Sequence, residues 1–433
     1  MIETYSIKLS GKLIIINQKQ GNIMGGERVE TNKINNQLIR ILTYLMFMMF
    51  AMTTDAVGVI IPEIIKEFNL THTQASAFHY GPMIAIAASG MFLGFLADRL
   101  GRKVTIIIGL SIFSLACGLF VVGNSFSFFL FLLVLSGTAI GIFKTAALAL
   151  VGDITTSNAD HTRTMNLVEG FFGVGAIIGP FIVSYLLAND VSWKYLYIVA
   201  GILCIGLCIV AAITQYPTYV RNQQSEQNLK QTLLIAKQPA ALGFSALIAF
   251  YVITEAAIYV WMPSLLSTYT GSLESLVPWT ITLFFTLRAL GRFGAVWVLK
   301  HISWELAMML FSAAICLCYV LSMILGLGAA IILLPMSGLF MAMIYPTLNS
   351  KGISCFAKDQ HGAIAGVILF FTAVAASLGP LLMAIVSDFM GGQAKYGFYV
   401  ATVFAVLLFV GLAYNWKFKP AQALLLQKQS ENN

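Results

Sequence analysis

The chain has 433 residues, of which 59% are hydrophobic and only 10% are charged, and its formal net charge is +7. Its mean hydropathy is +0.85. No soluble globular protein of this size needs so much apolar surface, so the composition excludes that class and indicates an integral membrane protein.

Residues 1–36 form a polar N-terminal segment that is rich in Asn, Gln, Lys and Gly. It contains one short apolar run, from Leu13 to Ile16, which cannot cross a bilayer. No small-residue cleavage site follows the first long apolar segment, so we predict no removable signal peptide. We expect a disordered cytoplasmic tail, most of which translation from Met24 would remove.

Twelve apolar segments follow, each of about the 20 residues that a bilayer-spanning helix requires. We therefore predict an all-α membrane protein with twelve transmembrane helices. The segments are 38–61, 75–97, 104–122, 127–150, 165–188, 195–214, 240–266, 277–299, 305–324, 327–349, 361–387 and 397–415.

The Lys and Arg residues are distributed unevenly between the two sides of these segments. With the N-terminus inside, nineteen lie in inner loops and tails, against three in outer loops, Lys66, Lys194 and Lys395. This bias predicts that both termini are cytoplasmic, in a bacterial inner membrane. The net positive charge is then a signal of topology, and we expect no nucleic-acid partner.

A dense charge cluster, residues 94–103, joins the second and third segments. Its pattern, Gly-x-x-x-Asp-Arg-x-Gly-Arg-Lys, resembles the signature of the major facilitator superfamily. The resemblance implies that Gly94 lets the second helix approach the other half, and that Asp98 latches the outward-open state. Alternatively, the cations only fix topology, which leaves Gly94 and Asp98 unexplained. The predicted latch residues are Gly94, Asp98, Arg99, Gly101, Arg102 and Lys103.

An internal repeat with an offset of 200 or 201 residues divides the chain. We predict two six-helix halves, 37–215 and 240–418, with a cytoplasmic linker at 216–239 and a tail at 419–433. Such halves place the substrate site between them. The matching positions are Thr54-Asp55-Ala56 and Thr254-Glu255-Ala256, Pro62 and Pro263, Gly94 and Gly294, Ser136-Gly137 and Ser337-Gly338, and Gly179-Pro180 and Gly379-Pro380.

Ionisable groups inside the predicted spans are expensive, so we expect them to face a cavity or one another. Three acids and three bases balance in number, which favours a polar central cavity. Asp55 and Glu255 are related by the repeat and are candidates to carry a proton; the alternative is a permanent ion pair. The six residues are Asp55, Lys144, Glu169, Glu255, Arg288 and Arg292.

The remaining candidates are distinguished by their depth in the spans. Lys144 either faces the cavity or forms an ion pair with Asp55. Arg288 is deeper than Arg292, which can extend to the membrane surface, so Arg288 is the better binding candidate. Glu169 lies near the inner mouth, and Asn166 lies on a lining helix.

Several stretches are most similar to the fucose, galactose and glucose proton-symporter group. That group's helix 1 Asp, implicated in sugar binding and proton coupling, corresponds to Asp55. The chain departs from the group where an acid is replaced by Lys144, an amide by Phe172 and a Gln by Glu169. The similar stretches are Asp55, Asn166-Leu167, Gly175 to Ile178, Tyr251-Val252 with Glu255, Gly291-Arg292-Phe293 and Tyr345-Pro346-Thr347.

We therefore predict a monomeric, proton-coupled secondary transporter that moves a small polar metabolite by alternating access. The solute is sugar-like or an organic anion that meets Lys144 and Arg288. Alternatives are an exporter of drugs, siderophores or other amphipathic compounds, and a sensor or scaffold that moves no solute. The six cysteines form no CxxC pair, and no phosphate loop or nucleophile with its base is present. We expect neither an enzyme nor a cofactor or metal.

Overall fold

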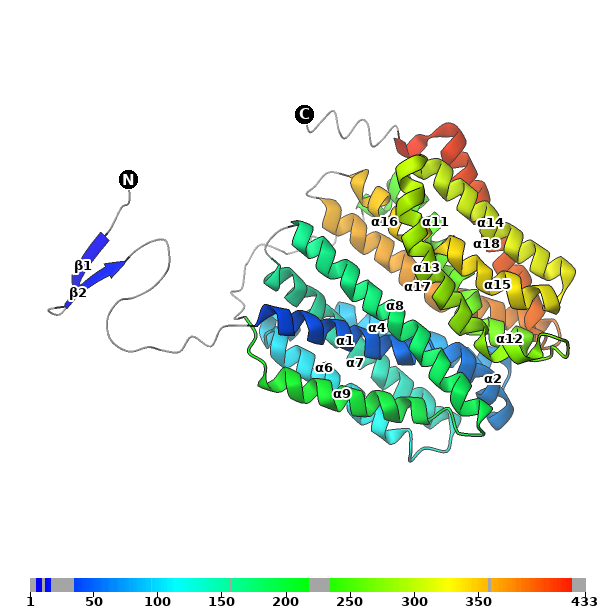
Figure 1. Cartoon of the computed structure of the whole chain (residues 1–433), viewed down its shortest axis with the longest axis horizontal. Helices are drawn as coiled ribbons and strands as arrows, with labels where there is room; N and C mark the ends of the chain where they lie inside the picture. Colours follow the sequence, from blue (N-terminus) through cyan, green and yellow to red (C-terminus); the bar gives the residue numbers. More distant parts are fainter. Residues whose placement is uncertain are drawn as a thin grey trace. The chain divides into compact units, whose positions relative to one another are not determined.

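The structure, a computed structural model, describes residues 5–9, 12–16, 35–94, 96–155, 158–217, 234–356 and 360–422. From residue 36 onward the helices form two groups, coloured blue to green and yellow-green to red in Figure 1. The first group is α1 Asn36–Thr54, α2 Val57–Phe68, α3 His72–Ala75, α4 Ala77–Leu93, α5 Leu96–Arg99, α6 Arg102–Leu119, α7 Phe126–Ile154, α8 Asn158–Ala188 and α9 Tyr195–Ile213. The second is α11 Pro239–Ala256, the π-helix η1 Ala257–Trp261, α12 Met262–Leu266, the 3-10 helix η2 Glu274–Trp279, α13 Thr280–His301, α14 Trp304–Leu325, α15 Leu327–Met341, α16 Ile344–Ser354, α17 His361–Phe389 and α18 Ala394–Phe418.

The N-terminal tail contains a β-hairpin. Strand β1 (Tyr5–Leu9) pairs antiparallel with β2 (Lys12–Ile16), with Tyr5 opposite Ile16. The prediction of a disordered tail is wrong for these residues, because the β-branched run Ile14 to Ile16 favours a strand. The rest of that predicted tail, residues 1–4, 10–11 and 17–34, lies outside the described residues, as do 218–233 of the linker and 423–433 of the C-terminal tail.

The twelve-helix prediction is confirmed. In the described part of the chain, eleven helical stretches are long and apolar enough to cross a membrane. The remaining predicted span, the second (75–97), corresponds to α4, which is shorter, with 17 residues. Most ends move by only a few residues; the first span, predicted at 38–61, extends over 36–68 because the polar end of α2 continues the helix beyond the apolar stretch.

Both halves interrupt their first helix beside a repeat-related acid. α1 ends at Thr54 and α2 begins at Val57, so Asp55 lies in the break. α11 ends one residue after Glu255 and continues as the π-helix η1. Irregular backbone at membrane depth is tolerated where neighbouring protein or a water-filled cavity satisfies it, and π-turns are frequent at functional sites. The two breaks therefore mark the region between the halves.

Repeat-related glycines make equivalent contacts in the two halves. A Cβ on Gly137 would lie 2.5 Å from the carbonyl oxygen of Pro82, and one on Gly338 would lie 2.6 Å from that of Phe284. Each contact joins the fourth helix of its half to the second. Small residues at such crossings let helix backbones approach closely. The same packing solution is thus used twice, as the internal repeat predicts.

The halves meet mainly at one end of the bundle. There α2 packs against η1 and α12, α3 and α4 pack against α17, and the Ser184 hydroxyl donates to the carbonyl of Pro278 (2.6 Å). We call this the outer end, where α2 ends and α3 begins. At the opposite, inner end, where α1 begins, α16 packs on α11, α14, α15 and α17, all helices of its own half. Among the described residues, the outer end is therefore the closed one.

The packing of α8 on α1 generates a stability prediction. A Cβ on Gly175 would overlap the carbonyl oxygen of Met48, whereas a Cβ on Gly170, in the same helix, meets nothing. We expect Gly175→Ala to destabilise the protein by about 1–3 kcal/mol through overpacking. Thermal unfolding in detergent should show a lower midpoint for Gly175→Ala and an unchanged or slightly higher one for the control Gly170→Ala, because Ala favours a helix over Gly. Equal midpoints for the two variants would contradict the close packing.

Candidate functional site

The sequence-predicted charges Glu255 and Arg288 form a direct ion pair. The Arg288 Nη2 atom lies 2.5 Å from Glu255 Oε1, and the two side chains are 23% and 10% exposed. Charges removed from water need such a partner. Arg288 Nε, which is buried, has no hydrogen-bond partner among the described residues. The charge of Arg288 is therefore largely compensated within the protein, which weakens its case as the main contact for an anionic solute.

Asp55 lies beside this pair but does not join it. Its Oδ2 accepts a hydrogen bond from the neighbouring Thr54 hydroxyl (3.1 Å). The carboxyl is within electrostatic range of Arg288, Lys144 and Glu255. The fold thus brings together four of the six predicted charges from the α1–α2 break, α7, α11 and α13, with the Asp55 carboxylate held by a hydroxyl and not by a cation.

Lys144 is held by aromatic rings. Its Nζ lies 5.2 Å from the centre of the Phe172 ring and 5.9 Å from that of Phe47. Within the described ranges it forms no ion pair, so the predicted alternative of an Asp55–Lys144 pair is not formed here. Ring faces attract a cation without neutralising it. Among the described residues, the ammonium is therefore left without an anionic group as its direct partner.

Two departures from the sugar-symporter pattern prove to be neighbours in space. The chain has Lys144 where that pattern has an acid and Phe172 where it has an amide, and these side chains contact each other. Both groups that hold sugar hydroxyls are thus replaced together by a cation and a ring. The signal was present in the sequence, but only the packing of α7 against α8 shows that the two replacements form one contact.

Glu169 and Asn166 of α8 are exposed, and Arg292 of α13 is half-buried. The Glu169 carboxylate acts electrostatically on Lys144, Arg292 and Tyr345, which belong to three different helices of both halves. An exposed group with such neighbours faces the region between the halves on the side away from the closed outer end. Glu169 therefore lies within electrostatic range of the central cations, and Asn166 lies one helical turn further toward the inner end.

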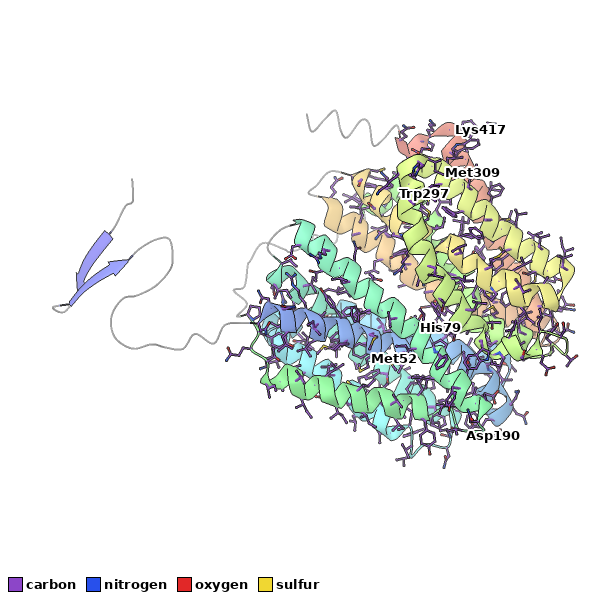
Figure 2. The ribbon with its side chains drawn as sticks, in the orientation of Figure 1. Met52, His79, Asp190, Trp297, Met309 and Lys417 are labelled. Atoms are coloured by element: carbon purple, nitrogen blue, oxygen red, sulfur yellow. The ribbon has the colours of Figure 1, made fainter. Side chains whose placement is uncertain are left out.

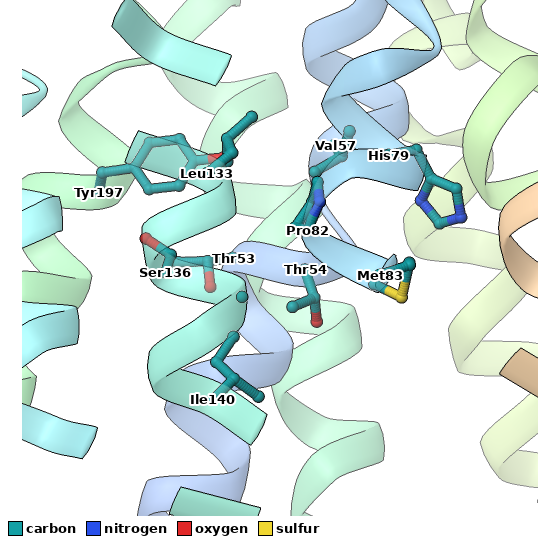
Figure 3. A pocket seen from close by; sticks show the side chains of 11 residues that line it. Thr53, Thr54, Val57, His79, Pro82, Met83, Leu133, Ser136, Ile140 and Tyr197 are labelled. Atoms are coloured by element: carbon teal, nitrogen blue, oxygen red, sulfur yellow. The ribbon is translucent and has the colours of Figure 1, made fainter. Parts of the chain in front are cut away.

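A small cavity lies beside the α1–α2 break (Figure 3). It has a volume of about 10 Å³, which is the space of one water molecule. Three buried polar atoms of lining residues have no hydrogen-bond partner in the described part of the chain: His79 Nδ1, Ser136 Oγ and the Tyr197 hydroxyl. The cavity is polar enough for water but too small for a solute, so it is not the transport site.

The signature residues hold the inner end of the first half together. Arg102 Nε donates to Asp153 at the end of α7 (3.0 Å), and Lys103 Nζ donates to the carbonyl of Thr214 after α9 (2.9 Å). Gly101 has φ +85°, a conformation that favours glycine. Arg99 is exposed.

The latch role of the signature remains a prediction. The nearest described atoms to a Cβ on Gly94 belong to Gly90 and to Thr145 (3.5 Å), both of the same half. Asp98 belongs to α5, and its side chain lies outside the described residues. The structure therefore adds a second use for the cluster, which is to bind α6 to α7 and α9.

Sequence reasoning did not predict the polar contacts between the halves, of which the one made by Asp388 is the most extensive in the described part of the chain. Asp388 of α17 accepts hydrogen bonds from the backbone N–H groups of His72 and Thr73 (2.9 and 2.7 Å) and lies 3.2 Å from His72 Nδ1. Asp388 falls just beyond the predicted span 361–387, so it was not counted among the membrane charges. An acid at a helix end is too common a feature to have identified this contact.

Known proteins resemble both the sequence and the fold. The sequence-family model described as the Major Facilitator Superfamily matches residues 43–380 of this chain. The chain belongs to this superfamily.

Multidrug resistance protein 2 of Bacillus subtilis (strain 168) is 26% identical over 86% of this chain and 94% of its own length. The L-fucose-proton symporter of Escherichia coli (strain K12) is 24% identical over 84% of this chain and 90% of its own length. A crystal structure of a bacterial homologue of the human lysosomal transporter Spinster, inward-facing and occupied, has a TM-score of 0.72 at 13% identity and covers 90% of this chain and 98% of that one.

These findings confirm both resemblances noted in the sequence. Superfamily members are transporters and not enzymes, so the chain is a multi-pass membrane transporter. The central charges are then candidates for a transport site. The relatives include a drug-resistance protein and a sugar symporter, and they leave the solute open.

The ion pair generates a prediction about stability. Glu255→Gln leaves the Arg288 guanidinium buried without its partner, and we expect a loss of about 3–5 kcal/mol. The double variant Glu255→Gln/Arg288→Gln should recover most of it, because no charge is then left unpaired. Thermal unfolding in detergent measures the stability of the single and of the double variant. The control is Glu63→Gln, which breaks an exposed Glu63–Lys66 pair and should change stability by less than about 1 kcal/mol. A double variant as unstable as the single one would contradict this account.

Proposed function

We propose that the protein is a proton-coupled secondary transporter of small organic anions. The single observation that carries the proposal is the Lys144 ammonium, which has no ion-pair partner among the described residues and lies against the rings of Phe47 and Phe172. A carboxylate of the solute would pair with the ammonium, and its apolar part would lie against the rings.

The arrangement of the other charges supports an anion over a sugar. Arg288 is already paired with Glu255, so among the described residues Lys144, together with Arg292 one turn further along α13, is left to attract an anionic solute. A sugar needs carboxylates and amides at the positions that Lys144 and Phe172 occupy. Fucose, which the Escherichia coli symporter is named for, is therefore the less favoured solute for this chain.

Asp55 is the proposed proton carrier. It lies in a helix break, its partner is a hydroxyl, and the charges of Arg288 and Lys144 act on it. A carboxyl whose cationic neighbours move relative to it changes its proton affinity. Rocking of the halves, or arrival of an anion at Lys144, would change this environment and so couple proton movement to solute movement. Glu255, held by Arg288, is the second candidate.

An exporter of amphipathic compounds is the second candidate function. The rings beside Lys144 favour it, as does the similarity to a multidrug resistance protein. A sensor or scaffold that moves no solute is the third and has no feature of its own in its favour. For all three, we propose a monomer in the bacterial inner membrane with both termini in the cytoplasm.

The solute class is tested by ligand-induced stabilisation. A ligand at 100 times its dissociation constant stabilises the folded protein by about 2.7 kcal/mol. We expect a carboxylate such as benzoate or succinate to raise the unfolding midpoint of the wild type and not that of Lys144→Ala. The control is Lys351→Ala, which removes a lysine that also lies over a ring, that of Trp304, outside the central cluster. Stabilisation by fucose or ethidium that persists in Lys144→Ala would favour the alternatives.

The coupling role of Asp55 is tested separately in liposomes. Asp55→Asn cannot release a proton, so we expect it to lose accumulation driven by a pH gradient and to retain exchange of labelled for unlabelled solute. Glu274→Gln, an exposed acid in an outer loop, is the control and should behave as wild type. Gradient-driven uptake by Asp55→Asn at the wild-type rate would assign the proton to another group.

A further inference from the structure

We propose that Asp388 is a gating residue, which holds the outer end of the bundle closed by capping the start of α3 across the interface between the halves. Asp388 lies near the end of α17 in the second half, whereas α3 and the α4 that follows it belong to the first half. The two partners are 316 residues apart in the chain.

Both carboxylate oxygens of Asp388 are used. Oδ1 accepts from the backbone N–H of His72 (2.9 Å) and lies 3.2 Å from the ring nitrogen Nδ1, which donates to it. Oδ2 accepts from the backbone N–H of Thr73 (2.7 Å). Hydrogen bonds to a charged acceptor are shorter and stronger than those between neutral groups. The side chain is 22% exposed, so part of its hydration has been replaced by these bonds.

The first N–H groups of a helix have no partner within the helix. The local cap of α3 is Thr71, whose hydroxyl accepts from Gln74, while the Gln74 side chain accepts from the N–H of Thr71. This capping box leaves the N–H groups of His72 and Thr73 to Asp388. The start of α3 is therefore completed by a residue of the opposite half, and separating the halves leaves it incomplete.

The surrounding contacts make the same interface close-fitting. The His72 ring lies 5.4 Å from that of Trp261, and a Cβ on Gly58 would overlap the carbonyl oxygen of Tyr259. His72 also lines an outer cavity of about 640 Å³ to which both halves contribute, with Lys66 from α2 and Lys395 from α18. Water in this cavity can replace the three hydrogen bonds when the halves part, so the contact is reversible.

The contact mirrors the predicted latch at the other end. Asp98, in α5, follows α4 at the inner end, and Asp388 lies at the outer end of α17, the helix that packs on α4. The first half would supply Asp98 at the inner end of the α4–α17 pair, and the second half would supply Asp388 at its outer end. This gating role rests on the alternating-access cycle proposed above.

The test is a distance measurement between spin labels on the two outer surfaces. Cysteines replace Asn124 and Ser272, exposed residues of outer loops in opposite halves, in a background without the six native cysteines. Loss of even one hydrogen bond to a charged group changes an equilibrium by about tenfold or more. We expect Asp388→Asn to raise the ratio of long to short distances by at least roughly tenfold. His72→Phe removes only the ring contact and should give a smaller rise.

The matched control is Asp190→Asn, a carboxylate at the outer turn between α8 and α9, labelled in Figure 2. It has the same change of charge and makes no bond to the other half within the described residues. If the distances in Asp388→Asn match those in Asp190→Asn, Asp388 does not hold the gate. If Asp388→Asn opens the outer end while no carboxylate is transported by the wild type, the gate stands and the proposed solute falls.

Discussion

The cost of placing charge in an apolar bundle is the constraint on which the central site depends. A buried cation without a partner destabilises a protein by several kcal/mol, so each central charge needs a partner. Arg288 has Glu255 as a direct partner, Lys144 has the rings of Phe47 and Phe172, and Asp55 has the hydroxyl of Thr54. These three solutions differ in how much charge they leave uncompensated.

That difference divides the site into a fixed and a variable part. The Glu255–Arg288 pair is internally neutral and stabilises the contact between α11 and α13. Lys144 and Asp55 have no ion of opposite charge as a direct partner among the described residues, and neither a ring nor a hydroxyl neutralises an ion. Groups of this kind respond to an incoming ion or proton, whereas a closed ion pair resists one. We therefore propose transport chemistry at the α1–α2 break and α7, in preference to the Glu255–Arg288 pair that sequence symmetry alone would favour.

The two halves are equivalent in packing but not in chemistry. Repeat-related glycines let the second and fourth helices of each half cross closely, so both halves share this packing. The charged contacts differ between the halves. In the first half, the signature residues bind α6 to α7 and α9, whereas Asp388 of the second half binds α3 of the first. Halves with different contacts at their two ends are suited to rocking, because each end can close without deforming a helix.

The sequence by itself determined the twelve spans, the two halves, the signature and the six charges inside the spans. A bilayer-spanning helix requires about 20 apolar residues, so a charged residue within such a segment is easily recognised. It did not determine partners. Whether Arg288 or Lys144 pairs with an acid, that Phe172 lies against Lys144, and that Asp388 meets His72 are decided by separations of a few ångströms between segments far apart in the chain. Such distances depend on how whole helices pack, and no local pattern of residues encodes them.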